Sequence, residues 1–183
     1  GNDMVVSIDT AGTISYHNFS AVYGELCRAA GCGPNGYLTH EAAAWIEGSK
    51  GGDGMWIFAP RRFSVEPFDE VMDEMRGGHS ILRYIVPGGH DGALDGGGNG
   101  AGRASAVRFA SDRSDSSMST GGPDGFDPRG ISSIRQLPGS TEILVALKTE
   151  EVGGRVASYL SVMRSNGQIL LPDVLVAEGF KFE

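Results

Sequence analysis

The sequence predicts an all-β protein with one short helix near residues 19–30. Three observations lead to this fold class. After Gly130, four apolar runs rich in β-branched residues alternate with short turns that contain glycine. A second unit with a similar layout can be drawn earlier, between residues 36 and 128. A single segment ahead of both units has apolar residues at helical spacing.

Residues 1–17 are predicted to form a strand pair. The run MVVSIDTAGTISY places apolar residues on both sides of Asp9 to Gly12, whose residue types favour a turn. We interpret this pair as the end of one β-unit.

The segment 18–31 is predicted to be a helix. Apolar or small residues recur at helical spacing in FSAVYGELCRAA, and Asn18 precedes them at the N-cap position. Gly31, followed by Pro34, predicts the end of the helix. Asn18 also begins the glycosylation sequon Asn-Phe-Ser, although an Asn engaged in capping would be an awkward acceptor.

The sequence contains two cysteines, Cys27 and Cys32, around the predicted end of this helix. At this spacing they form either a small local disulfide or two unpaired thiols, and the sequence leaves both open. Two ligands alone do not make a zinc site.

The range 36–128 is interpreted as one four-strand unit with an insertion. Its predicted strands are GYLTHEAAAW, MWIFAPRRF, HSILRYIV and SAVRFAS. An acidic segment, 66–76, extends the unit, and its part DEVMDEM predicts a solvated helical turn. Residues 87–128 hold 11 of the 29 glycines with many Ser and Asp residues, which predicts a flexible surface insertion.

The range 130–172 predicts four antiparallel strands: ISSIRQL, EILVALKT, RVASYLSVM and QILLP. The turns between them contain glycine, and Asn166-Gly167 is a strong hairpin signal. Such a meander is one blade of a β-propeller or one half of a β-sandwich. The terminal run VAEGFKFE is predicted to begin another strand, with 178–183 as the start of a further blade.

Charge and hydropathy exclude two classes of partner. With 15 Lys and Arg against 23 Asp and Glu, the formal net charge is −8, so a basic face for nucleic acid is not expected. No apolar run approaches the length of about 18–20 residues that a membrane helix needs, and no signal peptide is visible. The chain starts without Met and stops within a strand-like pattern, so we interpret it as a fragment or a processed piece.

His40 and Glu41 open a candidate site. The metalloprotease pattern H-E-x-x-H fails because Ala44 occupies the position of the second His. In a strand, His40 and Glu41 point to opposite faces and cannot form a joint site. A Glu among small and apolar residues is costly to bury alone, so Glu41 either faces solvent or pairs with a cation.

Arg61 and Arg62 follow the apolar run MWIF and form a second candidate. By alternation one of them faces inward or along a rim, where it would bind phosphate with two hydrogen bonds. The alternative is a surface Arg paired with one of the acids at 66, 69 or 70. The sequence has neither the Gly-Lys-Ser/Thr of a P-loop nor the G-x-S-x-G of a nucleophile elbow, and its four His residues lack ligand spacing.

Four segments together resemble the C-terminal half of the calcium-activated nucleotidases, or apyrases. They are YGELCRAAGCGPNGYLTHEAAAW, APRRF, GFKFE and the long run from GISSIRQL to QILLP. The resemblance covers nearly the whole chain except the insertion at 87–128, and motifs of this length in this order are specific.

The resemblance implies a five-bladed β-propeller, of which this chain holds about two blades and flanking strands. It also implies one Ca²⁺ in the central tunnel, with Glu41, Ser132 and Glu183 matching three ligand positions, and Arg61 matching a phosphate-binding position. Hard oxygen donors of this kind suit Ca²⁺. The catalytic residues stay unknown, because the family's first two blades, with several catalytic acids, would lie outside this chain.

Departures from the family's pattern support a second reading. The cysteines and the glycine-rich insertion are foreign to it, Met75 replaces an Arg, and His17 replaces an acid.

The expected function is Ca²⁺-dependent hydrolysis of nucleoside di- or triphosphates in the secretory pathway or outside the cell. The alternatives are a propeller without catalysis that serves as a scaffold or assembly component, and a carbohydrate- or protein-binding β domain, for which no aromatic platform is seen. A homodimer or a larger assembly stays open.

Overall fold

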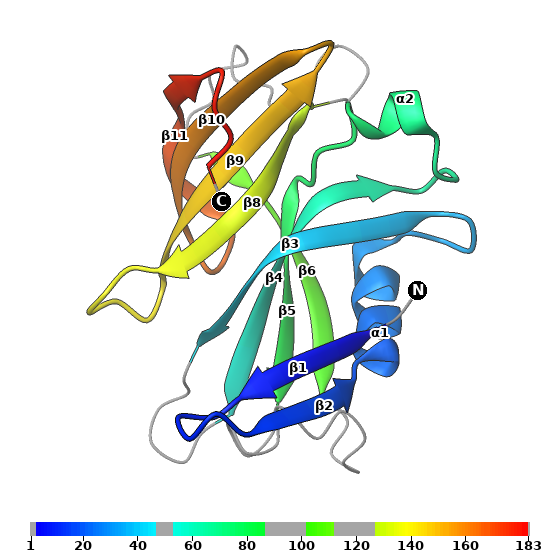
Figure 1. Cartoon of the computed structure of the whole chain (residues 1–183), viewed down its shortest axis with the longest axis vertical. Coiled ribbons are helices and arrows are strands. Elements are labelled where there is room, and N and C mark those ends of the chain that lie inside the picture. Colours follow the sequence, from blue (N-terminus) through cyan, green and yellow to red (C-terminus); the bar gives the residue numbers. More distant parts are fainter. Residues whose placement is uncertain (1–2, 47–52, 87–101, 112–126, 183) are drawn as a thin grey trace.

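The computed structural model describes residues 3–46, 53–86, 102–111 and 127–182. Within these residues the fold is almost entirely β, with strands in a two-stranded, a four-stranded and a five-stranded sheet (Figure 1). Two helices, α1 (Ser20–Ala30) and α2 (Glu70–Asp73), accompany them in the described part. The predicted all-β class with one helix near residues 19–30 is confirmed.

The chain begins with the hairpin of β1 (Met4–Ile8) and β2 (Ile14–Asn18), as the sequence predicted. Its turn is fixed by Asp9, whose Oδ1 accepts hydrogen bonds from the backbone N–H groups of Thr13 at 2.8 Å and Ala11 at 2.9 Å. These bonds lower the pKa of Asp9 because they stabilise the ionised carboxylate, and the bond from Thr13 has the largest effect.

Helix α1 follows the hairpin and covers one face of the four-stranded sheet. Phe19, Val22 and Leu26 are buried against Phe58 and Leu82 of that sheet. Burying a large apolar side chain stabilises a fold by about 1.5–3 kcal/mol, so this row is the main reason the helix stays in place.

The predicted capping role of Asn18 is wrong by one residue. Phe19 occupies the N-cap position, and its side chain has no acceptor atom with which to cap the helix. Its ring is 2% exposed and packs in the core. Asn18 instead accepts a hydrogen bond from the backbone N–H of Ser20, at 2.9 Å. The helix ends at Gly31 as expected.

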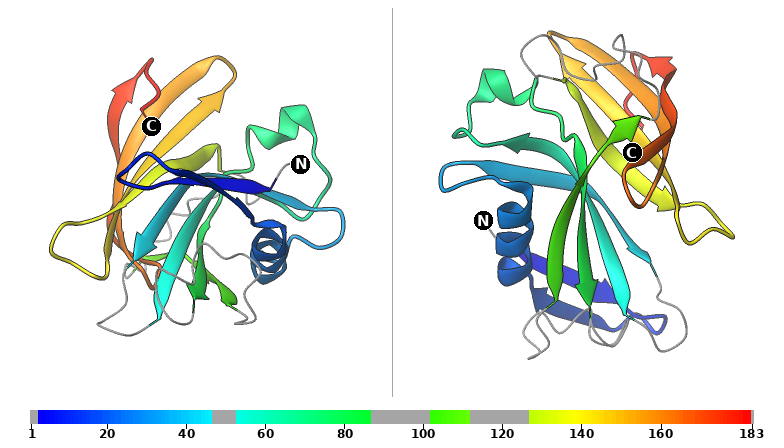
Figure 2. Two further views of the ribbon diagram at one scale, coloured as in Figure 1. Left: turned by 60° about the horizontal axis from the view of Figure 1, so that its bottom comes forward. Right: turned by 180° about the vertical axis from the view of Figure 1, so that it is seen from behind.

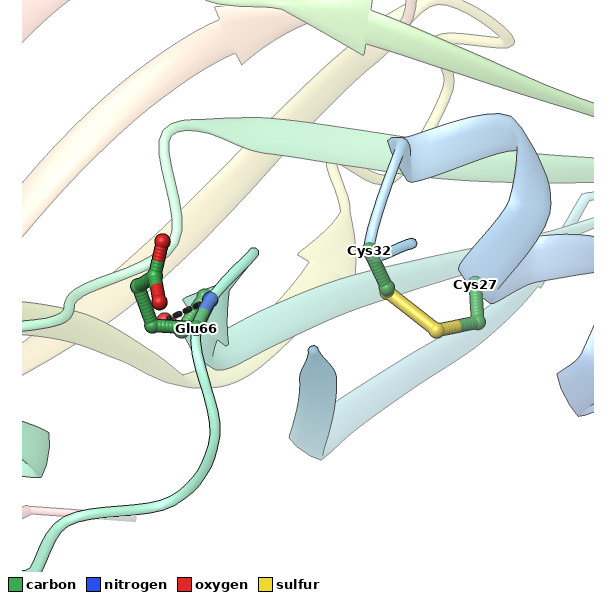
Figure 3. Close-up of a disulfide and its surroundings, with 4 residues drawn as sticks. Cys27, Cys32 and Glu66 are labelled. Atoms are coloured by element: carbon green, nitrogen blue, oxygen red, sulfur yellow. Dashed lines mark hydrogen bonds between the residues drawn. A yellow bond between two sulfur atoms is a disulfide. The ribbon is translucent and has the colours of Figure 1, made fainter. Parts of the chain in front are cut away.

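Cys27 and Cys32 form a disulfide across the end of α1, which decides between the two states that the sequence left open (Figure 3). Cys32 is fully buried, whereas Cys27 is partly exposed. The bridge joins the last turn of the helix to the segment that leads into the four-stranded sheet.

The four-stranded sheet contains β3 (Tyr37–Ile46), β4 (Gly54–Ser64), β5 (Ser80–Val86) and β6 (Arg103–Arg108), in that order and antiparallel. The short helix α2 lies between β4 and β5, where the acidic segment predicted a helical turn. Asp69 caps it by accepting hydrogen bonds from the N–H groups of Met72 and Val71, at 2.9 and 3.1 Å.

Composition placed the boundaries of the insertion too widely. The strand β6 lies inside the range 87–128 and pairs with β5 along its whole length, from Arg103 opposite Ile85 to Arg108 opposite Ser80. Small and β-branched residues suffice here because the strand is held by a neighbour rather than by its own apolar bulk. The other parts of the predicted insertion, 87–101 and 112–126, lie outside the described residues.

The five-stranded sheet has the order β7-β11-β10-β9-β8. Its members are β7 (Ala110–Ser111), β8 (Arg129–Gln136), β9 (Ile143–Val152), β10 (Arg155–Arg164) and β11 (Gln168–Glu178). The strands from β8 to β11 form the antiparallel meander that the sequence predicted. Figure 2 shows from behind how the chain runs from β6 into this sheet, where β7 pairs in parallel with β11.

The prediction that a new strand begins in VAEGFKFE is wrong, because the first three residues of this run belong to β11. Residues up to Glu178 still belong to β11 and pair with β10, with Glu178 opposite Ala157. Gly179 then takes a positive φ of 78°, which turns the chain away from the ladder. The following residues lie back over the sheet rather than forming a new strand in the described part.

The two larger sheets share one apolar core. Side chains of the first sheet, among them Ile57 and Ile81, pack with Ile131, Ile134 and Leu144 of the second. Where β8 meets β4, their backbones approach each other so closely that glycine is required. A Cβ added to Gly130 would lie 2.2 Å from the carbonyl oxygen of Arg61.

We predict that Gly130→Ala destabilises the protein by about 1–3 kcal/mol, because a rigid backbone atom must move to admit the methyl group. Gly24→Ala is the matched control: Gly24 lies in α1 with nothing within 4 Å of an added Cβ, so this change is expected to stabilise by about 0.5–1 kcal/mol. Urea unfolding of the full-length protein measures both. Equal effects of the two substitutions would contradict the close approach.

Candidate functional site

Two of the sequence-predicted site residues occupy bulges in neighbouring strands. In the pairing of β3 with β4, the register passes from His40 to Ala42 and skips Glu41. In the pairing of β8 with β9, it passes from Ile131 to Ser133 and skips Ser132. The strands β3 and β8 contact each other. Bulges free a residue from the ladder and re-aim it, and they are common next to active sites.

Arg61 lies at the centre of the candidate site. It comes from β4, is 7% exposed, and reaches side chains of both large sheets. Its Nε lies 3.2 Å from Oε1 of Glu41, and its Nη2 lies 2.8 Å from Oε1 of Glu151. Its Nη1 donates a hydrogen bond to the hydroxyl of Thr149. The structure therefore brings Glu41 and Arg61 together and adds two residues of β9.

A second cation completes this group. Lys181 Nζ lies 3.3 Å from Oε1 of Glu151, which is the carboxylate oxygen that Arg61 also contacts. Burial by itself raises the pKa of Glu151, but the charges of Arg61 and Lys181 and their hydrogen bonds outweigh it. The pKa of Glu151 consequently lies below its usual value, and the carboxylate is ionised at neutral pH. We call Glu41, Arg61, Thr149, Glu151 and Lys181 the Arg61 cluster.

The alternative prediction for the two arginines, a surface position with an acid at 66, 69 or 70, is wrong. Both are buried, and Arg62 points away from the Arg61 cluster toward Asp73, with Nε 3.8 Å from Oδ2. Its Nη1 donates to the carbonyl oxygen of Pro128 at 3.0 Å. Alternation along the strand holds, but the segments around α2 and Pro128 cover the second face. Burial, followed by the neighbouring charge of Arg61, lowers the pKa of Arg62.

His40 faces the opposite side of β3 from Glu41, as strand geometry predicted. Its ring lies 5.1 Å from each of the rings of Tyr23 and Phe58, measured between centroids, and its Nε2 lies 3.4 Å from the Tyr23 hydroxyl. His40 thus packs under α1 and takes no part in the Arg61 cluster. Burial lowers its pKa because the imidazolium loses hydration there.

Ser132 contacts the C-terminal segment rather than Glu41 or Arg61. Its hydroxyl donates to the carbonyl oxygens of Phe182 at 3.1 Å and Leu147 at 3.4 Å. Ser158 of β10 holds the same segment, because its hydroxyl donates to Phe180 O at 2.9 Å and accepts from Phe182 N at 3.0 Å. Glu183, the third predicted metal ligand, lies outside the described residues.

Sequence reasoning missed Thr149, Glu151 and Lys181. Glu151 lies between the predicted strands EILVALKT and RVASYLSVM, where the sequence predicts a turn, whereas β9 extends to Val152. The available signal was the long apolar alternation before it, which allows the strand to continue through both glutamates. Lys181 carries no local signal, because its contact depends on how the chain folds back after Gly179.

A second buried charge network lies in the five-stranded sheet. Lys148 Nζ lies 2.9 Å from Oδ1 of Asp173, and Arg129 Nη1 lies 3.2 Å from Oδ2 of the same residue. Arg129 also contacts Asp127, whose side chain is 2% exposed, at 3.3 Å. Every member has an opposite charge at hand, as buried charges require, and the network links side chains of β8, β9 and β11.

The chain belongs to the apyrase family. The family model described as Apyrase matches residues 1–85 and 104–183, which leaves out only part of the glycine-rich tract. The all-β fold is consistent with this family.

Three members of the family are similar to this chain along nearly its whole length. The chain is 31% identical over 176 residues to soluble calcium-activated nucleotidase 1 of Mus musculus, a match covering 93% of this chain and 36% of that protein. It is 29% identical to apyrase apy-1 of Caenorhabditis elegans over 98% of this chain and 43% of the relative. The apyrase of Phlebotomus duboscqi is 28% identical, with 98% and 45% covered. The chain thus spans less than half the length of these relatives.

In the described part of the chain, neither helix has the length and apolar character that crossing a membrane requires.

We predict that the free energy of unfolding falls as the pH is lowered below about 6.5, the ordinary pKa of His. The folded pKa of His40 lies below the unfolded value, so its contribution is fully present above 6.5 and is lost as the pH falls toward the folded pKa. Burial also lowers the pKa of His79, which therefore affects stability in the same direction. The His40→Phe variant keeps the ring packing with Tyr23 and Phe58 but cannot titrate.

Urea midpoints of the full-length protein at about pH 7.5 and about pH 5.5 test this prediction. The wild type is expected to lose more stability between the two conditions than His40→Phe does. An identical loss in both proteins would show that His40 is not held in its neutral form.

Proposed function

We propose that the protein hydrolyses the terminal phosphoanhydride bond of nucleoside di- or triphosphates and releases phosphate in a Ca²⁺-dependent reaction. Membership of the apyrase family supports this proposal, as do relatives named calcium-activated nucleotidase. The observation that carries it is the Arg61 cluster, in which a buried guanidinium meets two carboxylates where two sheets converge. A protein of net charge −8 needs such local cations to hold a polyanionic substrate.

The proposal includes a five-bladed β-propeller, in which the two antiparallel meanders are adjacent blades. Exposed apolar side chains support further blades on both sides. One face of the β1–β2 hairpin presents Val6, Ile8 and Tyr16, and β11 presents Val174 and Val176. The relatives' additional length, more than half of each, would supply the blades that cover them.

The donor chemistry of the bulged residues fits Ca²⁺. Glu41 offers a carboxylate that is 39% exposed, and Ser132 offers a carbonyl at a bulge. Both are hard oxygen donors of the kind that Ca²⁺ prefers, although the ion takes about six to eight of them. The proposal assigns further ligand positions to Glu183 and to the part of the relatives that this chain does not span. When bound, the cation would polarise the phosphate oxygens and neutralise developing charge.

The chain's own residues would position the substrate. Arg61 is the phosphate-binding group, since its planar guanidinium can exchange a carboxylate for a phosphate in the same geometry. Glu151 and Thr149 hold Arg61 in place from β9, so that it need not be ordered during binding. Lys181 adds a second positive charge beside Glu151. The residue that activates water is not assigned to this chain.

One observation favours the alternative of a scaffold without catalysis. Charged residues around α2, where Met75 departs from the family's pattern, are used in structural contacts here. Asp73 accepts a hydrogen bond from the hydroxyl of Tyr37 and pairs with Arg62. Arg76 donates to the carbonyl oxygen of Pro67 at 2.9 Å. A scaffold would release no phosphate at any Ca²⁺ concentration, which separates the two functions.

The proposed compartment is the secretory pathway or the extracellular space. The disulfide between Cys27 and Cys32 supports it, because disulfides persist in oxidising compartments and are rare in the cytosol.

We predict that the full-length protein releases phosphate from UDP, GDP or ADP, and that chelation by EGTA abolishes the release. Glu41→Gln is expected to lower the rate by at least about tenfold, which corresponds to about 1.4 kcal/mol of lost transition-state stabilisation. The control is Glu178→Gln, an exposed acid paired with Arg155 outside the Arg61 cluster. Activity that persists in EGTA would refute the role of the metal. Full activity of Glu41→Gln would contradict the assignment of Glu41 as a metal ligand.

A second prediction concerns the Arg61–Glu41 ion pair. A cation bound by Glu41 competes with Arg61 for the same carboxylate, so Arg61→Gln is expected to raise the Ca²⁺ affinity by about threefold to tenfold, while lowering activity. Isothermal titration of the full-length protein without nucleotide measures the affinity. Arg155→Gln, which removes an exposed Arg paired with Glu150 and Glu178, is the control and should leave it unchanged. Unaltered or weaker Ca²⁺ binding by Arg61→Gln would contradict the competition.

A further inference from the structure

The junction between the hairpin and helix α1 contains the sequon Asn18-Phe19-Ser20, which occurs once in the sequence. Asn18 is the last residue of β2, and Ser20 is the first of α1. Both are exposed, whereas Phe19 between them is 2% exposed and packs in the core with Val22 and Leu26. The buried ring therefore anchors a short segment that presents its two polar residues to solvent.

The conformation of Asn18 separates the atom it uses for structure from the atom that glycosylation uses. Its Oδ1 accepts a hydrogen bond from the backbone N–H of Ser20 at 2.9 Å, in an Asx turn. A glycan is attached to Nδ2, so the modified side chain keeps its carbonyl oxygen and this bond. The objection that a capping Asn is an awkward acceptor does not hold, because Asn18 does not cap the helix.

An independent observation concerns the compartment. The disulfide between Cys27 and Cys32 closes the other end of the same helix (Figure 3). Such a bond forms in the oxidising lumen of the secretory pathway, which is also where asparagine-linked glycans are added. Three observations favour the same modification: the exposure of Asn18, the use of Oδ1 rather than Nδ2 in its hydrogen bond to Ser20, and the disulfide.

We propose that Asn18 carries an N-linked glycan. The donor is a lipid-linked oligosaccharyl diphosphate. A bond forms between Nδ2 of Asn18 and C1 of the first sugar while the C1–oxygen bond to the diphosphate breaks. The lipid diphosphate leaves with the electron pair of the broken bond, and the proton that Nδ2 loses passes to solvent. The reaction occurs on the new chain, and the exposed position in the fold leaves room for the product.

The test is peptide mapping of the full-length protein secreted from a eukaryotic host. Peptides containing residue 18 are compared by mass spectrometry before and after treatment with peptide N-glycosidase, which converts a glycosylated Asn to Asp. We expect conversion at Asn18 in the wild type. Glycans elsewhere in a longer protein do not affect this result, because the readout is a single peptide.

The matched variants are Asn18→Gln and Ser20→Ala. Ser20→Ala destroys the sequon but keeps Asn18 and the backbone N–H to which it is bonded, so the local fold is preserved while the glycan is expected to be lost. Ser20→Thr restores a sequon and should carry the glycan. The proposal is overturned if Asn18 is unmodified in the secreted wild type with the Cys27–Cys32 disulfide formed, or if Ser20→Ala remains modified at Asn18. Neither outcome bears on nucleotide hydrolysis.

Discussion

The guanidinium of Arg61 is the interaction on which the arrangement of the site depends. It is buried at the junction of the two large sheets, and a buried cation is tolerated only where anions and hydrogen-bond acceptors surround it. Glu41 supplies one anion from the first sheet, and Glu151 supplies the other from the second. Separating the two sheets would leave Arg61 with Glu41 as its anion and would remove its contacts with Glu151 and Thr149. The relative position of β3, β4 and β9 is therefore coupled to the electrostatics of the site.

Close backbone contacts make this arrangement possible. Gly130 sits against the carbonyl of Arg61, and the N–H of Gly78 donates to that carbonyl at 3.2 Å. With larger residues at these points, β8 could not approach β4 closely enough for Thr149 and Glu151 to reach the guanidinium. Apolar packing between Ile57, Ile81 and the residues of β8 and β9 provides the driving force, while glycine sets how near the backbones come.

The bulges at Glu41 and Ser132 show how a regular β fold accommodates polar function. A bulge releases one residue from the ladder without ending the strand, so its side chain or carbonyl can serve another purpose. The rest of each strand continues to bury alternate apolar residues. The same division appears at the junction before α1, where Phe19 is buried and its neighbours Asn18 and Ser20 are exposed. In both places, stability and proposed function use adjacent residues that face opposite ways.

The sequence by itself determined the fold class, the antiparallel succession from β8 to β11 and the position of α1, because apolar periodicity and turn residues are local properties. It also separated His40 from Glu41, since alternation alone puts them on opposite faces. Only the tertiary structure decided which charges meet. Arg61 lies 90 residues from Glu151, and no local pattern indicates that distance in sequence. The disulfide and the return of the chain after Gly179 also depended on neighbours. In each case a short segment with weak preferences of its own took its conformation from the surface on which it packs.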